Sequence, residues 1–540
     1  MIHIDPQTPL AQVRPDVMGM TAAAVSDHPL ATAAGSAVLA RGGNAVDAAI
    51  TMAAVLTVVR PHMCGIGGDA FLLILDASTR TVHALNGSGA AGSRASAEVL
   101  RRRGMATPPV YGAAAVTVPG AVRAWEDALA RFGTRPFRDA LAPAIRYARE
   151  GFPATTRLML DLEEEHDRLA ADPGLRTVFL ASGDVPHTGD IVRQPALGSS
   201  LERLARDGAD ALYRGALAAA IVRHLGADGL LTERDLEAHA SEWGVPIAAS
   251  FGDSRVLTAP PNSQGIALLM QLGIAEEAGI ASMVDDAEAY VGTLAEGCRL
   301  ALAARDQHVA DPRHSAIPVD ELLDRGFLRS LAGRIGARRA SRRRGSGGTG
   351  GRAASGDTVF LGAVDREGNA VSMIQSLFHA FGTGTMVPET GIVLHNRGSA
   401  FALDPESPRL LAPGIRPYHT LAPAMVLAPD DSIRMVLGTP GGDAQTQTLT
   451  QVLLSRMLLG MSPQRALDAP RWRLYGDSLL ASEDRMPVRL RARLHTAGFR
   501  VVARPRSGEF GGAQLIEVVQ PSGARLAAAD GRREAFAIAF

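Results

Sequence analysis

The chain has 540 residues, 46% of them hydrophobic, and a formal net charge of -1, so it can hold several domain-sized units and has no overall charge that would attract nucleic acid or a membrane surface. Two cysteines are too few for a disulfide framework. The amino-terminal residues lack the pattern of a signal peptide, and the longest apolar stretch, Ala45–Val59, is too short to span a bilayer. We expect a soluble cytoplasmic protein without membrane or nucleic-acid partners.

The amino-terminal part of the chain predicts alternating strands and helices. A strand is expected over Met20–Val25, a helix from Pro29 to Gly42, a second helix from Ala45 to Arg60 and a strand over Ala70–Asp76. Ser26 and Asp27 are expected to cap the first helix, and Asn44 forms a capping box with Asp47 for the second. The glycine-rich turn Cys64–Asp69 precedes a strand, which is the wrong order for a dinucleotide-binding loop. This turn either lets the backbone pack closely or lines a site.

The middle of the chain predicts mainly helices that pack around the sheets. Helical patterns cover Ala121–Phe132, Phe137–Glu150, Leu201–Asp207, Ala211–Leu225 and Ala287–His308, another begins at Ile266, and a strand is expected over Arg255–Ala259. Thr232 is the expected cap of a further helix, with Asp235 as its partner. The isolated histidines of this region lack the spacing of metal ligands. No metal and no cofactor are predicted.

The most unusual stretch runs from Arg338 to Gln375. It begins with five arginines and a glycine-rich run that ends at Gly351, a composition typical of a flexible linker. Asp357-Thr358 follows, and two buried strands joined by a turn are then predicted over Val359–Asp365 and Ala370–Gln375. The stretch is either an ordinary interdomain linker or a loop that is cut before Thr358, which would then become a new amino terminus.

Several sequence motifs follow one another along nearly the whole chain. They are HPLATAAGSAVLARGGNAVDAAI from His28, CGIGGDAF from Cys64, VTVPGAV from Val116, PPNSQG from Pro260, ADP from Ala310, DT at Asp357, FGTG from Phe381 and GTPGG from Gly438. In these motifs the sequence resembles the gamma-glutamyltransferase family, a branch of the N-terminal-nucleophile hydrolases. The resemblance implies an α+β protein with the four-layer αββα sandwich of those enzymes.

The resemblance also implies that the precursor cleaves itself between Asp357 and Thr358. Residues 1-357 would form the large chain, with a flexible linker at about 331-357, and residues 358-540 the small chain. Thr358 Oγ would attack the Asp357 carbonyl, an N-to-O shift would give an ester, and water would separate the two chains. The expected partners are these two chains of one precursor, alone or as a dimer of such pairs.

A threonine at a new amino terminus carries its own base. Its α-amine has a reference pKa of about 7.7–8.0, whereas the same nitrogen inside the chain is an amide and cannot accept a proton. Gly441 and Gly442 stand where the family has its oxyanion hole, a pair of N–H donors for the tetrahedral intermediate. Ser376 matches a family position where a threonine hydroxyl holds the nucleophile. These four residues are the predicted catalytic set.

The sequence departs from gamma-glutamyl enzymes at several substrate-binding positions. Ser88 replaces an arginine that grips the substrate α-carboxylate, Phe378 replaces an asparagine, Arg397 and Ala400 replace the glutamine and aspartate that hold the α-amino group, and His419-Thr420 replaces a pair of serines. Acceptors for an ammonium group are lost and a fixed cation is added, so a substrate carboxylate is expected at Arg397. The other predicted substrate-binding residues are His419, Thr420, Ser88 and Asn86. An internal salt bridge is the alternative interpretation of Arg397.

Three functions remain open at this point. The pattern resembles the sub-branch that contains oxamate amidohydrolase and other acylases, which implies hydrolysis of an amide of a small acidic substrate, oxamate-like or glutaryl-like, with water as acceptor. The alternative is a gamma-glutamyl hydrolase or transpeptidase that acts on glutathione. A scaffold that binds nucleic acid through the arginines of residues 338–344 is the third, although the segment lacks aromatic residues for base stacking. A phosphate-binding loop in residues 345–352 is excluded because the Gly-Lys-Ser/Thr ending is absent.

Overall fold

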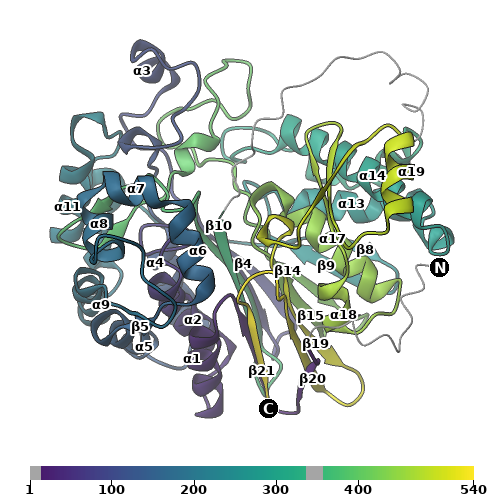
Figure 1. Cartoon of the computed structure of the whole chain (residues 1–540), viewed down its shortest axis with the longest axis horizontal. Coiled ribbons are helices and arrows are strands. Elements are labelled where there is room, and N and C mark those ends of the chain that lie inside the picture. Colours follow the sequence, from purple (N-terminus) through teal and green to yellow (C-terminus); the bar gives the residue numbers. More distant parts are fainter. Residues whose placement is uncertain (1–13, 336–356) are drawn as a thin grey trace.

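The computed structural model describes residues 14–335 and 357–540, and these form four layers in which two sheets are packed between two layers of helices (Figure 1). The first sheet has the strand order β21-β2-β10-β11-β3-β4-β7 and the second the order β1-β20-β19-β15-β14-β9-β8. Neighbouring strands are antiparallel throughout both sheets. This architecture confirms the expected α+β class and the αββα sandwich.

The strands of the first sheet are β21 (Phe536–Ala539), β2 (Ala23–Ser26), β10 (Asp357–Val364), β11 (Ala370–Phe378), β3 (Asp69–Asp76), β4 (Thr81–Gly87) and β7 (Glu242–Gly244). Those of the second sheet are β1 (Val17–Gly19), β20 (Ala524–Ala529), β19 (Gln514–Val519), β15 (Ile433–Gly438), β14 (Ala424–Leu427), β9 (Ser254–Thr258) and β8 (Ile247–Phe251). Smaller strands are β5 (Phe152–Pro153), β6 (Ile191–Val192), β12 (Met386–Val387), β13 (Ile392–Val393), β16 (Trp472–Tyr475), β17 (Leu479–Glu483) and β18 (Arg500–Arg504).

The two helical layers differ in size (Figure 1). The layer on the first sheet contains α1 (Pro29–Ala40), α2 (Ala45–Val59), α4 (Ala121–Phe132), α5 (Phe137–Glu150) and α9 (Pro195–Asp207), and that on the second sheet contains α13 (Ile266–Glu277), α14 (Ala287–His308), α17 (Gln445–Met457) and α18 (Pro463–Asp468). The remaining helices are α3 (Ala97–Arg102), α6 (Thr156–Glu164), α7 (His166–Ala171), α8 (Pro173–Phe179), α10 (Asp210–Tyr213), α11 (Ala216–Leu225), α12 (Glu233–Glu237), α15 (Val319–Leu322), α16 (Arg325–Ala332) and α19 (Val488–Thr496). Short 3-10 turns are η2 (Ala113–Ala115), η3 (Gly226–Asp228), η4 (Ile280–Met283), η6 (Arg397–Ala400), η7 (Gly442–Ala444) and η8 (Gly508–Phe510).

The central strands of the first sheet are buried on both faces. Leu72 and Leu361 belong to the core between this sheet and its helices, whereas Phe71 and Phe360 belong to the core between the two sheets. Side chains alternate along a strand, so Thr358, two residues before Phe360, faces the second sheet. Strands β10 and β11 lie between β2 and β3, and the segments before and after Thr358 therefore contribute to the same sheet.

Most expected elements are present with slightly different ends. The capping boxes of Asn44 with Asp47 and of Thr232 with Asp235 are confirmed. The expected helix over residues 211–225 is divided into α10 and α11, because Gly215 adopts a φ of 73° between them. The linker expected at about 331–357 lies mostly outside the described residues, and its two ends belong to α16 and β10. In the described part of the chain, no helix is both long and apolar enough to cross a membrane.

The cap of the first helix differs from the expected one. His28 caps α1 through its Nδ1 atom, which accepts a hydrogen bond from the Leu30 N–H at 3.1 Å. Ser26 is the last residue of β2, and Asp27 binds strand β10 instead of the helix. A capping side chain and a strand end look alike in a single sequence. Ser26 bonds locally to Thr32, whereas the Phe360 N–H that Asp27 binds is distant in the chain.

Candidate active site

The predicted nucleophile lies at the start of β10, in the middle of the first sheet. Thr358 is paired with Ser376 on β11, and Ser376 is paired with Asp69 on β3, so the three residues form one row across neighbouring strands. The Thr358 hydroxyl donates a hydrogen bond of 3.0 Å to Ser376 Oγ, which also accepts the Phe378 N–H at 2.8 Å. Thr358, Ser376 and Asp69 are all buried. The side chain of Asp357, the other residue of the predicted cleavage site, lies outside the described residues.

Asp27 supports β10 from the side opposite to Ser376. Its Oδ2 accepts the Phe360 N–H at 2.7 Å, and its Oδ1 accepts the side-chain amide of Gln514 at 2.8 Å. Regular pairing of β2 with β10 ends at Ser26, so this carboxylate replaces a backbone acceptor at the next position. Burial raises the pKa of Asp27 to about 6, against the opposing attraction of Arg533. The backbone of β10 is thereby fixed two residues beyond the nucleophile.

The Gly441-Gly442 turn follows β15, the strand of the second sheet that ends at Gly438. A Cβ added to Gly438 would lie 2.1 Å from the ring of Phe360, so this end of β15 packs directly against β10. The φ angles of Gly441 and Gly442 are 133° and 57°, which residues with side chains rarely adopt. Within residues 14–335 and 357–540, neither of these two N–H groups donates a hydrogen bond. Two N–H groups without internal acceptors are what an oxyanion hole requires.

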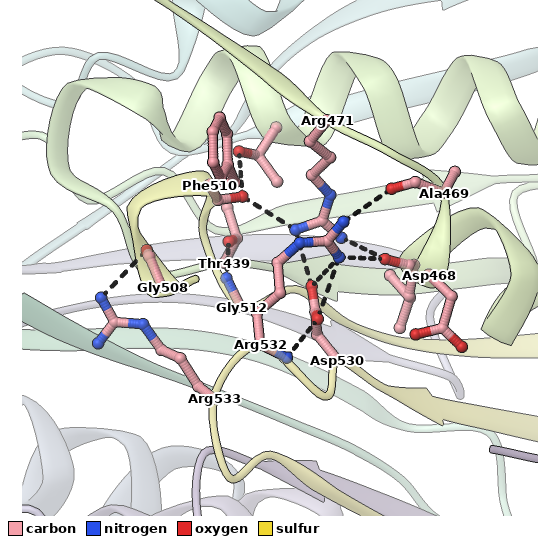
Figure 2. Close-up of polar contacts among 12 residues, drawn as sticks. Thr439, Asp468, Ala469, Arg471, Gly508, Phe510, Gly512, Asp530, Arg532 and Arg533 are labelled. Atoms are coloured by element: carbon pink, nitrogen blue, oxygen red, sulfur yellow. Dashed lines mark hydrogen bonds and ion pairs between the residues drawn. The ribbon is translucent and has the colours of Figure 1, made fainter. Parts of the chain in front are cut away.

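A buried ionic cluster that includes Arg471, Asp530 and Arg532 lies near Thr439, two residues before this turn (Figure 2). Thr439 Oγ1 accepts the Gly512 N–H at 3.1 Å, and a Cβ on Gly511 would lie 2.6 Å from that oxygen. The loop that contains these glycines is held by Arg471, which donates to the Phe510 carbonyl at 3.0 Å and lies 2.7 Å from Asp530 Oδ2. The cluster therefore acts on the glycine turn through the loop at residues 508–512.

Gln264, from the PPNSQG motif, joins the glycine turn to the segment that contains His419. Its side-chain amide donates to the Gly442 carbonyl at 3.0 Å and to the Thr420 carbonyl at 2.7 Å. Its Oε1 accepts the Nη1–H of Arg305 at 2.7 Å, which orients the amide. Gln264 is completely buried, so these bonds fix the two segments relative to each other.

A second group of polar side chains gathers around Asp69. His419 Nε2, His395 Nδ1 and Arg397 Nε lie 3.5, 3.6 and 3.7 Å from Asp69 Oδ2. The Arg397 guanidinium stacks on the ring of Phe378, 4.0 Å from its centroid, and its Nη1 lies 3.4 Å from Thr420 Oγ1. All the charged groups of this cluster are fully buried. Among the described residues, the two carboxylate oxygens of Asp69 make no hydrogen bond, and the Nε and Nη2 atoms of Arg397 make none either.

Burial is the largest influence on the pKa values of the side chains around Asp69. It raises the pKa of Asp69, while His395 and Arg397 oppose the shift. It lowers the pKa of Arg397 to about 10, with Asp69 as the main opposing charge, so the guanidinium stays charged at neutral pH. Burial and the neighbouring Arg397 hold the pKa of His419 well below its usual value, and burial also lowers that of His395. Both histidines are therefore neutral beside one cation and one carboxyl group.

Asn86 and Ser88 lie at the end of β4, beyond Asp69 in the same sheet. Asn86 Oδ1 accepts the Ser88 N–H at 2.9 Å and the Ser88 hydroxyl at 2.6 Å, and Asn86 Nδ2 donates to Asn262 at 2.9 Å. Asn86 also lines a cavity of about 420 Å³ together with Phe71, Trp243 and Pro261. Asn86 is thus the one substrate-binding residue expected from the sequence that lines this cavity.

The structure brings most of the predicted site residues to one end of the space between the sheets. Thr358 contacts Ser376, and Arg397 contacts Thr420 and lies beside Asp69, as His419 does. The internal salt bridge considered for Arg397 is present at 3.7 Å, on Nε, which leaves the end of the guanidinium unpaired by a carboxylate. No role in the site was predicted from the sequence for Asp69, His395 or Asn262, and Asp27 was expected only to cap a helix. Asp69 ends the CGIGGD turn, which the sequence marked only as a segment that could line a site.

No group of metal-binding side chains large enough to hold an ion occurs in the part of the chain that the structure describes. Cys64 and Cys298 are both buried and free. Burial raises the pKa of each thiol, so neither is a reactive thiolate near neutral pH.

Comparison with known proteins places this geometry in a family. The family model described as Gamma-glutamyltranspeptidase matches residues 31–540. The chain is 38% identical over 529 residues to the oxamate amidohydrolase proenzyme of Klebsiella pneumoniae, which covers 96% of this chain and 98% of that protein. It is 38% identical over 461 residues to the glutathione hydrolase-like YwrD proenzyme of Bacillus subtilis, covering 84% and 85% of the two. The crystal structure of cephalosporin acylase from Bacillus halodurans superimposes with a TM-score of 0.91 at 33% identity and covers 99% of both chains.

The family model matches the chain from residue 31 onward, a range that contains Asp69, Thr358 and the Gly441-Gly442 turn. The chain belongs to the gamma-glutamyltranspeptidase family and is an enzyme of the N-terminal-nucleophile hydrolase type.

Proposed function

We propose that Thr358, freed by self-cleavage after Asp357, is the nucleophile of an amidohydrolase that acts on an amide of a small acid. The observation that carries the proposal is the buried 3.0 Å hydrogen bond from the Thr358 hydroxyl to Ser376 Oγ. It holds the hydroxyl in one orientation at the first residues of a central strand. The whole-length similarity to proenzymes supports cleavage at this position.

Cleavage is an acyl shift followed by hydrolysis. Thr358 Oγ1 attacks the carbonyl carbon of Asp357 and loses its proton, the C–N bond breaks, and the Thr358 nitrogen takes up the proton to become an amine. The resulting ester is hydrolysed by water, which gives the carboxylate of Asp357 and restores the Thr358 hydroxyl. Ser376 accepts the hydrogen bond of that hydroxyl in the intact chain and so directs its oxygen.

The new α-amine then serves as the base of the catalytic cycle. It takes the proton of Oγ1 as this oxygen attacks the substrate amide, and it gives the proton to the leaving nitrogen. The negative charge of the tetrahedral intermediate is expected at the N–H groups of Gly441 and Gly442. Water hydrolyses the acyl ester in the same way and releases the acid.

Arg397 is the proposed partner of the substrate carboxylate. Its Nη2 has no hydrogen-bond partner among the described residues, and Phe378 covers one face of the guanidinium. A carboxylate can occupy the free end of a guanidinium with strong, charge-assisted hydrogen bonds. The similarity to an oxamate amidohydrolase supports a small acidic acyl group, with His419, Thr420, Ser88 and Asn86 completing the pocket.

A gamma-glutamyl amide is the second candidate substrate, and one observation favours it. Asp69 provides a buried carboxyl group 3.7 Å from Arg397, close to where the substrate carboxylate is proposed. An ammonium group next to that carboxylate would meet an opposite charge there. The similarity to a glutathione hydrolase-like protein points in the same direction.

The two chains are expected to stay together after cleavage. Strands β10 and β11 of the small chain lie between β2 and β3 of the large chain. Both cysteines precede Thr358, so no disulfide can join the two chains and the association is non-covalent. We therefore propose an assembly of one large and one small chain.

Intact mass spectrometry of the purified protein tests the nucleophile. The wild-type protein should give two fragments that separate only under denaturing conditions, and Thr358→Ala should give one chain of full length. Thr383→Ala, which removes another buried threonine hydroxyl in the same half of the chain, should be cut normally. An uncut wild-type chain that still hydrolyses amides would refute the proposal. Turnover of an oxamate or glutaryl amide against a gamma-glutamyl anilide then decides between the two substrates.

A further inference from the structure

Asp69 is the one carboxyl group of the buried cluster and lies in the same row as the nucleophile. It faces Ser376, which in turn faces Thr358, and adjacent strands are about 4.8 Å apart, so Asp69 and Thr358 are about 10 Å apart along the row. This distance is comparable with the length of a short acyl chain that extends from the nucleophile. A glutaryl or gamma-glutamyl group bound to Thr358 would therefore extend towards the space between Asp69 and Arg397.

The charges of this space are balanced before a substrate arrives. Arg397 contributes one positive charge and an ionised Asp69 one negative charge, while His395 and His419 are neutral. Arg416, which also faces Asp69, is paired with Glu242 at 3.2 Å. A carboxylate on Arg397 would add a second negative charge close to Asp69 in a fully buried environment. An uncompensated buried charge is strongly destabilising. The balance is restored if Asp69 takes up a proton or if the substrate carries an ammonium group of its own.

We propose that Asp69 determines which acyl groups the site accepts: it binds one proton when the acyl group carries only a carboxylate, and it stays ionised and pairs with the ammonium when the acyl group is an α-amino acid. The proposal rests on the proposed function, because it places the substrate carboxylate at Arg397. Neither Asp69 oxygen makes a hydrogen bond in the described chain, and the contacts of Oδ2 with His419, His395 and Arg397 are 3.5–3.7 Å long, so both oxygens can still bind a proton or an ammonium group.

Several titratable or charged side chains from different elements face Asp69. None of them is expected to take up the proton that accompanies a substrate carboxylate. His395 and His419 approach from the segments after β13 and before β14, and the pKa values of both are lowered. Arg397 and Arg416 are cations, and burial raises the pKa of Tyr213, which stays neutral. The pKa of Asp69 itself is raised from 3.8, mainly by burial, so its protonated form persists to higher pH than that of an exposed aspartate.

The direction in which kcat/KM changes with pH follows from the protonation state that each substrate requires of Asp69. A glutaryl group requires protonated Asp69, so its kcat/KM should fall about tenfold per pH unit above the pKa of Asp69 in the free enzyme. A gamma-glutamyl group requires the ionised form and should not show this fall. The Thr358 amine affects both substrates equally, so the ratio of glutaryl to gamma-glutamyl anilide turnover isolates Asp69.

The experiment uses the processed two-chain enzyme with glutaryl and gamma-glutamyl anilides, which differ only in the α-ammonium group. In Asp69→Asn the turnover ratio should become independent of pH, and the kcat/KM for the gamma-glutamyl anilide should fall on the order of 10²-fold because the buried charge pair is lost. Asp76→Asn is the matched control on the same strand, since the Asp76 carboxylate bonds the neighbouring turn residues Ser78 and Thr79. An unchanged pH dependence of the ratio in Asp69→Asn, or an equal loss for both anilides, would overturn the proposal.

Calorimetric binding of glutarate, measured in buffers of different ionisation enthalpy, separates this proposal from the proposed function. Wild-type enzyme should take up one proton per glutarate above the pKa of Asp69, and Asp69→Asn should take up none. Binding through Arg397 without proton uptake refutes only the role of Asp69. Equal affinity of Arg397→Gln and wild type for glutarate refutes the carboxylate site of the proposed function. Absence of glutarate binding by the wild-type enzyme overturns both.

Discussion

The hydroxyl of Thr358 and the hydroxyl of Ser376 are joined by a 3.0 Å hydrogen bond across the two central strands of the first sheet. Both side chains are buried, and the Ser376 oxygen is itself held by the Phe378 N–H. This relationship fixes the direction in which the Thr358 oxygen points before any cleavage has taken place. The contribution of Ser376 to this orientation can be measured by removing its hydroxyl.

Replacement of Ser376 by alanine should slow both self-cleavage and amide turnover, by roughly 10²-fold, because the Thr358 hydroxyl loses the acceptor that orients it. Ser376→Thr keeps the hydroxyl and should retain most activity. The rates are read from the appearance of the small chain on mass spectra and from kcat of the processed enzyme. Ser372→Ala, on the same strand and bonded to Leu437 O, should leave both rates nearly unchanged. Normal rates in Ser376→Ala would show that strand geometry alone orients the nucleophile.

A substitution in the glycine turn should affect chemistry more than binding. Gly441→Ala introduces a side chain at a φ of 133° and should displace the two N–H groups, lowering kcat by about 10²–10³-fold with a small change in KM. Steady-state kinetics measure this difference. Gly460→Ala is the control, because it also has a positive φ of 64° but lies in open space away from the site. A similar loss of kcat in both variants would indicate general backbone strain.

The stability of the protein should fall with rising pH because of Asp27. Its pKa is raised from 3.8 to about 6, so between these values the folded protein binds a proton that the unfolded chain has already lost. Stability therefore decreases as pH rises through this window, by about 3 kcal/mol in total, and the loss persists above it. Asp27→Asn has no such group, and its unfolding midpoint in urea should lack this part of the pH slope. Measuring both in the Thr358→Ala chain avoids cleavage during the experiment. Identical slopes would mean that Asp27 titrates normally.

The buried cluster of Figure 2 should connect stability with activity. Arg471→Met removes the donor to the Phe510 carbonyl and leaves Asp530 with fewer cations, which should cost about 3 kcal/mol in the free energy of unfolding. Because the same loop holds Thr439, kcat should fall as well while KM changes little. Urea denaturation and steady-state kinetics provide the two readings. Arg206→Met, which breaks an exposed ion pair with Asp207, should change neither by a measurable amount. A stability loss without a kcat effect would restrict the cluster to a structural role.

Local patterns predicted much of the fold correctly. The capping box at Asn44, the helix over residues 287–308 and the strand pair after Thr358 are specified by short-range chemistry, and all three are present. Ordered motifs identified the family, and with it Thr358, Ser376 and the Gly441-Gly442 turn. The local structure of the segments that contain these residues follows largely from their own sequence.

The environment of the substrate could not be predicted in the same way. Arg397 was recognised as a cation that replaces an acceptor, but its neighbour Asp69 is more than 300 residues away in the chain. The two residues meet because the turn before β3 is bonded to the segment after β13, where the His395 N–H donates to the Gly67 carbonyl at 3.0 Å. Asp27 was assigned to a helix cap for a similar reason, since its true partner is the Phe360 N–H on β10.

The sequence by itself determined most of the elements and the family and predicted the nucleophile, because caps, periodicity and ordered motifs act over short distances. Only the tertiary structure decided which charges share the buried space beside that nucleophile. The energy of a buried charge depends on the partners within a few ångströms, and strand pairing, rather than proximity in the chain, selects those partners.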